Sequence, residues 1–182
     1  WTEEQQRSFD QARQFARQEL CHVAEAGDEA GAEAAWRRRW SACAGFGIQG
    51  LNIPTAYGGL GLDTRTAVHV LEGLGQGCDD NGLLMALGAQ LWSVHPPLIA
   101  FGTAEQKRTW LPLLAQGAQV GAFALTEPES GSDVFHLRTR AYPERGGFRL
   151  EGIKTFITNA PLADVFLMFA ATDPHAGYFG LT

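Results

Sequence analysis

A change in hydrophobic spacing near residues 116–119 divides this 182-residue sequence into two kinds of structure. Before this point, apolar residues recur every three or four positions, which is typical of amphipathic helices. After it, short apolar or alternating runs are separated by turn residues, which is typical of strands. We therefore predict the α+β class, with an all-α helical domain over residues 1–118 and a β domain over residues 119–182.

The helical domain is expected to open with two helices. Thr2 and Gln5 form a capping-box pattern, and Gly27 is expected to end the first helix. The second helix is predicted over residues 31–44, followed by a glycine-rich loop over residues 50–63. The residues predicted to form the apolar faces of these two helices are Phe9, Ala12, Ala16, Leu20 and Val23, and then Trp36, Trp40 and Cys43.

Three further helices are predicted before the change in spacing. Asp63 or Thr64 caps the first of them, and the second is an apolar helix over residues 81–102 that restarts at Pro96. Thr103 and Gln106 form another capping box, which opens a helix that ends at Gly117. The arginines at 37–39 are expected to lie on a solvated face.

The β domain is expected to be an incomplete antiparallel sheet or barrel-like structure. We predict a strand at 121–125, a hairpin-like turn at 143–147, a buried strand at 164–171 and another strand from residue 177. A sheet of about sixty residues leaves edges that more strands or a helix must cover. We therefore expect further polypeptide, as a continuation or a partner chain, to complete it.

Composition excludes several classes of protein. A net charge of −6 argues against nucleic-acid binding. We find no apolar run near the roughly 18 residues of a membrane span, and no signal-peptide pattern at the N-terminus. The three cysteines are scattered, which is typical of reduced thiols in a cytoplasmic protein. The five histidines are isolated and no metal-binding or nucleotide-binding glycine motif is present, so no metal site is predicted.

Two segments of the β domain carry candidate binding chemistry. The first, Gly121–Asp133, passes from a strand through Thr126-Glu127-Pro128 into a turn rich in glycine and serine. Such a turn exposes backbone N–H groups that suit an anion such as a pyrophosphate. The second, Gly152–Asn159, is predicted to be a strand with Lys154, Phe156 and Thr158 on one face. An aromatic ring beside a hydroxyl suits a flat heteroaromatic ligand.

These two segments together resemble the paired signature of the flavin-dependent acyl-CoA dehydrogenase family, in the stretches Leu125–Asp133 and Gly152–Asn159. Gly50–Leu62 and Phe101–Lys107 resemble two earlier blocks of the same family, in the same order. The resemblance runs over the whole chain, which corresponds to roughly the first half of a typical member. It implies that the C-terminal helical bundle of the family is absent from this chain.

The resemblance also implies an FAD site. By position, Phe123, Leu125 and Thr126 would lie along the edge of the flavin ring, and Gly131 and Ser132 would approach the pyrophosphate. Phe156, Ile157 and Thr158 would contact the ring, with Phe156 stacking and Thr158 bonding near its reactive nitrogen. The flavin itself would carry the redox chemistry.

The implied reaction is α,β-dehydrogenation of an acyl thioester. A carboxylate in the following helical domain would remove the α-proton, so no catalytic base is predicted in this chain. Many members have tryptophan in place of Phe156, and glycine and alanine in place of Glu129 and Ser130. A carboxylate at Glu129 would repel the phosphates of the thioester carrier, so a carrier protein is an alternative to CoA.

The expected partners are an electron-transfer protein or oxygen, the missing C-terminal half or a partner chain, and further copies in a homo-oligomer. Two other readings remain open at this point. The chain could belong to an oxygenating member of the family. It could also be a non-catalytic half that acts only as a binding or structural module, in which case it should expose a large apolar face.

Overall fold

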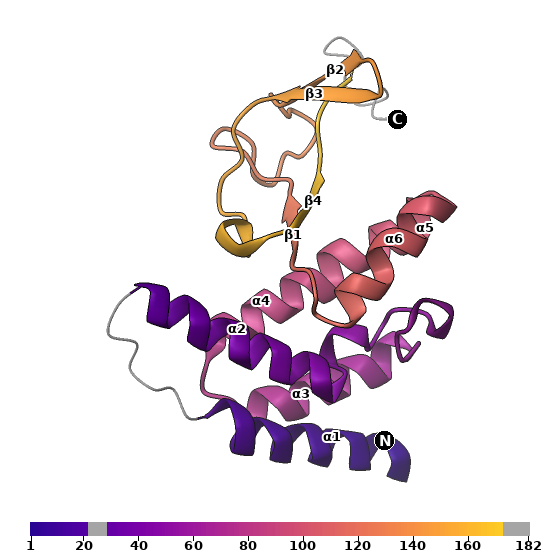
Figure 1. The fold of residues 1–182 in the computed structure, drawn as a ribbon, viewed down its shortest axis with the longest axis vertical. Helices are drawn as coiled ribbons and strands as arrows, with labels where there is room; N and C mark the ends of the chain where they lie inside the picture. Colours follow the sequence, from indigo (N-terminus) through magenta and orange to yellow (C-terminus); the bar gives the residue numbers. More distant parts are fainter. Residues whose placement is uncertain (22–28, 173–182) are drawn as a thin grey trace. The chain divides into compact units, whose positions relative to one another are not determined.

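The computed structural model describes residues 1–21 and 29–172. The chain forms two compact units, Trp1–Val120 and Gly121–Thr182, which we call the helical unit and the β unit. Figure 1 shows helices in the first and a small sheet region in the second, which confirms the predicted fold class. No closed barrel forms among the described residues. The exact division at 118/119 stays a prediction.

The first helix begins where the sequence predicts. In α1 (Glu3–Phe15), Thr2 Oγ1 accepts a hydrogen bond from the Gln5 N–H, and the Gln5 side chain accepts one from the Thr2 N–H. A π-helical segment, Ala16–Leu20, continues α1. The predicted apolar positions within the described residues are buried, namely Phe9, Ala12, Ala16 and Leu20. Val23 and the predicted end at Gly27 lie outside the described residues.

Glycines let α1 pack closely against α3 (Thr64–Gly77), which lies beside it in Figure 1. A Cβ atom at Gly73 would lie 2.3 Å from the carbonyl oxygen of Phe9, and one at Gly77 would lie 2.3 Å from that of Arg13. Neither clash can be relieved without moving backbone, so these two positions require glycine. Asp63 caps α3 by accepting a hydrogen bond from the Thr66 N–H, as predicted.

The second helix, α2 (Glu29–Phe46), carries the predicted aromatic pair. The rings of Trp36 and Trp40 stack with centroids 4.8 Å apart. The prediction of a solvated arginine face is wrong for Arg39, whose guanidinium lies 3.1 Å from the Asp80 carboxylate in a largely buried ion pair. The loop that follows contains two short 3₁₀ helices, Ile48–Gly50 and Thr55–Tyr57.

The apolar segment Asn81–Phe101 is a helix in three parts: α4 (Asn81–Ala89), a π-helical segment (Gln90–Val94) and α5 (His95–Phe101). Pro96 lies in the first turn of α5, where a missing N–H is tolerated, so the predicted restart is confirmed. The segment has 21 residues and contains an 18-residue stretch with a mean hydropathy of 1.3, so it is long and apolar enough to cross a membrane by length and composition alone. The expectation that no such run exists is therefore wrong. Its buried leucines nevertheless belong to the core of the helical unit.

The last helix of this unit, α6 (Ala104–Ala115), opens with the predicted capping box of Thr103 and Gln106. Gly117 follows its end with a φ of +64°, as expected for a glycine after a helix. Cys21, Cys43 and Cys78 are free thiols, as expected.

Up to residue 172, where the described part of the chain ends, the β unit contains two pairs of strands. β2 (Arg140–Glu144) and β3 (Gly147–Glu151) are antiparallel, whereas β1 (Gly121–Ala124) and β4 (Val165–Met168) are parallel. The hairpin turn is narrower than predicted, because Pro143 and Glu144 belong to β2 and only two residues connect the strands. The prediction of a buried strand at 164–171 is wrong, since β4 alternates between half-buried and exposed residues. The strand predicted from residue 177 lies outside the described residues.

Candidate functional site

The first predicted binding segment has the structure that the sequence indicates. β1 ends at Ala124, and the chain then turns at Glu127-Pro128. The turn is closed by two backbone hydrogen bonds, from Glu127 N–H to Ser130 O (3.0 Å) and from Ser130 N–H to Glu127 O (3.2 Å). The Ser130 hydroxyl donates to the carbonyl oxygen of Asp133. Gly131 and Ser132 lie on the exposed part of this turn, as a phosphate-facing loop requires.

The second predicted segment is not a strand. β3 ends at Glu151, and Phe156 and Asn159 have positive φ angles of +55° and +71°. A residue with positive φ interrupts the alternation of side chains along a strand. Lys154, Phe156 and Thr158 therefore do not share a strand face, and that prediction is wrong. The cause is a set of hydrogen bonds that draw this segment against residues 121–127.

Hydrogen bonds join the two segments within the described residues. Lys154 Nζ donates to the Leu125 carbonyl oxygen (2.9 Å) and to Glu127 Oε1 (2.8 Å). The Thr155 N–H donates to the Thr126 carbonyl oxygen (3.0 Å), and Asn159 Nδ2 donates to the Gly121 carbonyl oxygen (3.1 Å). The two sequence blocks thus lie side by side and fix each other's backbone.

Glu127 is the electrostatic centre of this arrangement. Its side chain is only 3% exposed, and its carboxylate accepts hydrogen bonds from Lys154, the Arg138 N–H and the Thr139 N–H. Burial raises the pKa of this carboxyl, but the hydrogen bonds outweigh it and lower the pKa to about 2. Glu127 is therefore a stable anion near neutral pH and a poor proton acceptor.

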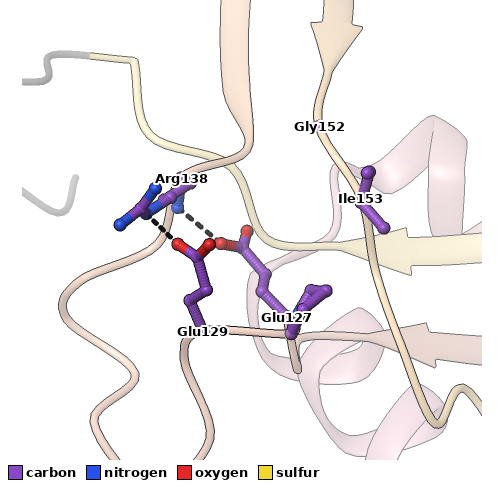
Figure 2. Close-up of a pocket in the computed structure, with 6 residues that line it drawn as sticks. Glu127, Glu129, Arg138, Gly152 and Ile153 are labelled. Carbon is purple, nitrogen blue, oxygen red and sulfur yellow. Dashed lines mark hydrogen bonds and ion pairs between the residues drawn. The ribbon is translucent and has the colours of Figure 1, made fainter.

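A pocket of about 230 Å³ opens beside Glu127, between the turn and the end of β3 (Figure 2). At this pocket Glu129 forms an ion pair with Arg138, with 2.6 Å between Glu129 Oε2 and Arg138 Nε. Both side chains are mostly exposed, so solvent screens the pair. The guanidinium also offsets the charge of Glu129. The predicted repulsion between Glu129 and a phosphate is therefore weaker than the sequence alone implies. The residues that line the pocket are Glu127, Pro128, Glu129, Arg138, Gly152 and Ile153.

All eight predicted cofactor residues lie in the β unit, and six of them lie in the two joined segments. Phe123 packs edge-to-face against Phe169, with ring centroids 5.3 Å apart. Phe156 has its side chain turned to solvent, with 91% of the residue exposed. The other four in the joined segments are half-buried: Leu125, Thr126, Ile157 and Thr158. The remaining two, Gly131 and Ser132, are on the turn.

Sequence reasoning missed the residues that hold these segments together. The sequence pattern predicts Lys154 on a strand face with Phe156, and Asn159 at the end of that strand. Their polar partners are 29 and 38 positions away in the sequence, so no local pattern could identify them. A lysine within an otherwise apolar and hydroxyl-rich stretch was the available signal, since a buried lysine requires a partner.

The arrangement fits a flat dinucleotide on three counts. The Phe156 ring offers an exposed face, and a Cβ atom at Gly131 would meet no atom within 4 Å, so a ligand can approach that backbone closely. The Thr126 N–H donates no hydrogen bond within the described residues, which leaves a donor at the end of β1. The chemistry available is therefore stacking, hydrogen bonding to a ring edge and contact with a phosphate.

The described residues contain no group of three or more His, Cys, Asp or Glu that could hold a metal ion. Three of the histidines have polar contacts within the described residues. His69 lies 3.0 Å from Glu72 and His95 lies 2.9 Å from Asn52, while His136 contacts Asp133. The other two, His22 and His175, lie outside the described residues.

Comparison with known proteins agrees with this geometry. Residues 2–118 match the family model of the acyl-CoA dehydrogenase N-terminal domain, and residues 122–181 match that of the middle domain. An L-prolyl-[peptidyl-carrier protein] dehydrogenase of Pseudomonas fluorescens is 43% identical over 80% of this chain and 38% of its own length. An acyl-CoA dehydrogenase of Bacillus subtilis is 38% identical over 75% of this chain and 35% of its own length.

Solved structures give the same result. The prolyl acyl carrier protein oxidase AnaB superposes with a TM-score of 0.84 at 37% identity, over all of this chain and 48% of AnaB. PigA with FAD and proline superposes with a TM-score of 0.87 at 33% identity, over 99% of this chain and 46% of PigA. This chain thus spans less than half the length of these relatives. On the family models and these similarities, the chain belongs to the acyl-CoA dehydrogenase family.

Proposed function

We propose that this chain forms the flavin-binding part of an enzyme that removes hydrogen from the α- and β-carbons of an acyl thioester. The observation that carries the proposal is the joining of segments 121–127 and 154–159, which presents the Phe156 ring and the Thr126 N–H from one folded unit. PigA, a relative of known structure, was solved with FAD.

Each cofactor residue then has a role. Phe123, Leu125 and Thr126 would line the edge of the flavin ring, and Phe156, Ile157 and Thr158 would contact the ring itself. Gly131 and Ser132 would lie at the pyrophosphate, where the exposed turn allows close approach. FAD, when bound, supplies the acceptor for the hydride that leaves the β-carbon. The protein groups orient the cofactor and tune its acidity and potential.

The base that takes the α-proton lies outside this chain in our proposal. Glu127 is unsuitable because its pKa is about 2 and its charge is already used by Lys154. Glu129 is paired with Arg138 on the surface. A carboxylate from the remaining polypeptide, or from a partner chain, would complete the site.

We further propose that the acyl group is carried by a carrier protein, with a prolyl group as the first candidate. Two relatives, 43% and 38% identical, are named L-prolyl-[peptidyl-carrier protein] dehydrogenases, and AnaB acts on a prolyl carrier protein by its name. Glu129, whose charge Arg138 partly offsets, also lines the pocket at a position where many family members have a small residue. CoA is the competing carrier.

The remaining features of the complete enzyme are proposals by family resemblance. We expect a homo-oligomer in the cytoplasm that passes electrons to an electron-transfer protein or to oxygen. The proposed division into domains 1–118 and 119–182 belongs with them, and the matched ranges 2–118 and 122–181 support it.

The test uses the intact polypeptide that carries this sequence. We expect visible flavin absorbance after purification or after addition of FAD, and bleaching of that absorbance by L-prolyl carrier protein without oxygen. Prolyl-CoA and a carrier protein loaded with glycine, which has no β-carbon, are the controls. A protein that never takes up FAD would contradict the proposed function and favour a non-catalytic module. Bleaching by prolyl-CoA alone would contradict only the choice of carrier.

A further inference from the structure

We propose that Lys154 is a positioning residue, which sets the direction of the peptide group between Leu125 and Thr126 so that its N–H meets the edge of the flavin ring. The proposal rests on the proposed function, since it assumes that FAD binds at these segments. It assigns to a buried lysine a role that none of the sequence motifs indicates.

The first observation is the contact between Lys154 and the peptide group that joins Leu125 to Thr126. Lys154 Nζ lies 2.9 Å from the Leu125 carbonyl oxygen, and the lysine side chain is 7% exposed. In a planar trans peptide, the carbonyl oxygen and the following N–H point in opposite directions. The bond from Lys154 therefore fixes where the Thr126 N–H points, and that N–H donates no hydrogen bond within the described residues.

The positive charge of Lys154 also affects how strongly the Thr126 N–H can donate a hydrogen bond. A cation that binds a carbonyl oxygen polarises the peptide and strengthens the N–H on its far side as a donor. Lys154 thus affects both the direction and the strength of the Thr126 N–H. A neutral apolar side chain at position 154 would remove both effects.

Glu127 makes this buried cation tolerable. Its Oε1 lies 2.8 Å from Lys154 Nζ, and its carboxylate is in turn fixed by the N–H groups of Arg138 and Thr139. A buried charge without a partner costs several kcal/mol, so the two residues depend on each other. Glu127 therefore holds Lys154, and Lys154 holds the peptide.

If Lys154 had only a structural role, as the partner of the buried Glu127, its substitution would have different effects. The neighbouring peptide, between Thr126 and Glu127, is held separately by the Thr155 N–H at 3.0 Å. Loss of Lys154 should thus free the Leu125–Thr126 peptide while the adjacent link remains. If Lys154 only neutralised Glu127, removal of both charges would restore every property of the protein.

The experiment compares three variants of the intact polypeptide with the unsubstituted protein: Lys154→Met, Lys154→Arg and the double variant Glu127→Gln/Lys154→Met. The readouts are the FAD dissociation constant, the flavin midpoint potential and the stability of the apoprotein. Arg149→Met is the matched control, because Arg149 is a half-exposed cation of the β unit whose described contacts are with Glu144, Glu151 and the Tyr142 ring, outside the joined segments.

We expect Lys154→Met to weaken FAD binding about ten-fold, the effect of one hydrogen bond, and to lower the midpoint potential. Lys154→Arg should restore much of both, since it keeps the charge and the donors. The double variant should regain apoprotein stability but keep the weak FAD binding and the lowered potential. Arg149→Met should behave as the unsubstituted protein.

Recovery of normal FAD affinity and potential in the double variant would overturn the proposal, as would a Lys154→Met protein with unchanged values. If both methionine variants fail to fold, hydrogen exchange of the Thr126 amide in the unsubstituted protein decides. Strong protection of that amide on addition of FAD is expected, and its absence would overturn the proposal. Failure of the unsubstituted protein to bind FAD at all would instead contradict the proposed function.

Discussion

At the scale of single residues, Phe156 has a backbone conformation that phenylalanine seldom adopts. Its φ is +55°, and the residue is 91% exposed, so no packing of its ring accounts for the strain. The conformation is imposed by neighbours, since Thr155 is bonded to Thr126 and Asn159 to Gly121. Strain that the surrounding structure enforces on an exposed aromatic ring is consistent with a role in binding.

We therefore predict opposite effects of Phe156→Gly on stability and on cofactor binding. Glycine relieves the positive φ and should stabilise the β unit by about 1 kcal/mol, while loss of the ring weakens FAD binding. Phe148→Gly is the control, because Phe148 is also exposed but lies in the regular strand β3, where glycine destabilises. Hydrogen exchange of residues 121–172 measures stability. Equal destabilisation by both substitutions would contradict the prediction.

At the scale of elements, helices with local capping signals were the most predictable part of the chain. Each cap joins residues three positions apart, so a short stretch of sequence contains the whole interaction. The pairs are Thr2 and Gln5, Asp63 and Thr66, and Thr103 and Gln106. The segment Gly152–Asn159 was predicted wrongly because Lys154 bonds to residues 27 and 29 positions away. The ion pair of Arg39 with Asp80 was missed for the same reason.

The capping box of α6 gives a prediction for one element. Thr103→Ala removes the acceptor for the Gln106 N–H and should destabilise the helical unit by about 1 kcal/mol. Thr109→Ala is the matched control, since Thr109 is exposed in the middle of the same helix, where the better helix propensity of alanine should raise stability by roughly half a kcal/mol. Urea unfolding followed by tryptophan fluorescence compares them, and Trp110 lies in α6 itself. A loss as large for Thr109→Ala would argue against the cap.

At the scale of the whole molecule, the two units contain different acid-sensitive groups. In the helical unit, burial lowers the pKa of His95 from 6.5 to about 3. Below pH 6.5, His95 is protonated in the unfolded chain but stays neutral in the folded chain. The free energy of unfolding therefore falls as the pH drops from 6.5 towards 3. In the β unit, the Glu127 pKa is lowered from 4.5 to about 2. The contribution of this carboxylate to the stability of the β unit is therefore lost only as the pH falls from 4.5 to about 2.

We predict that acid weakens the helical unit before the β unit, by at most about 1.4 kcal/mol per pH unit from His95. All five tryptophans lie within Trp1–Val120, so their fluorescence reports unfolding of the helical unit alone. NMR signals of residues 121–172 report the β unit. His95→Gln should abolish the early loss, whereas simultaneous loss of both signals above pH 4.5 would contradict independent behaviour of the units.

The π-helical segment Gln90–Val94 is a place where the sequence can lose a residue during evolution. A π turn takes up one extra residue while the α-helical turns on both sides keep their rotational phase. Leu87 before the segment and Val94 at its end both remain buried. A single-residue deletion within 90–94 should thus convert the segment to ordinary α-helix and leave the fold intact. The same deletion inside α4 would rotate the apolar residues that follow it towards solvent.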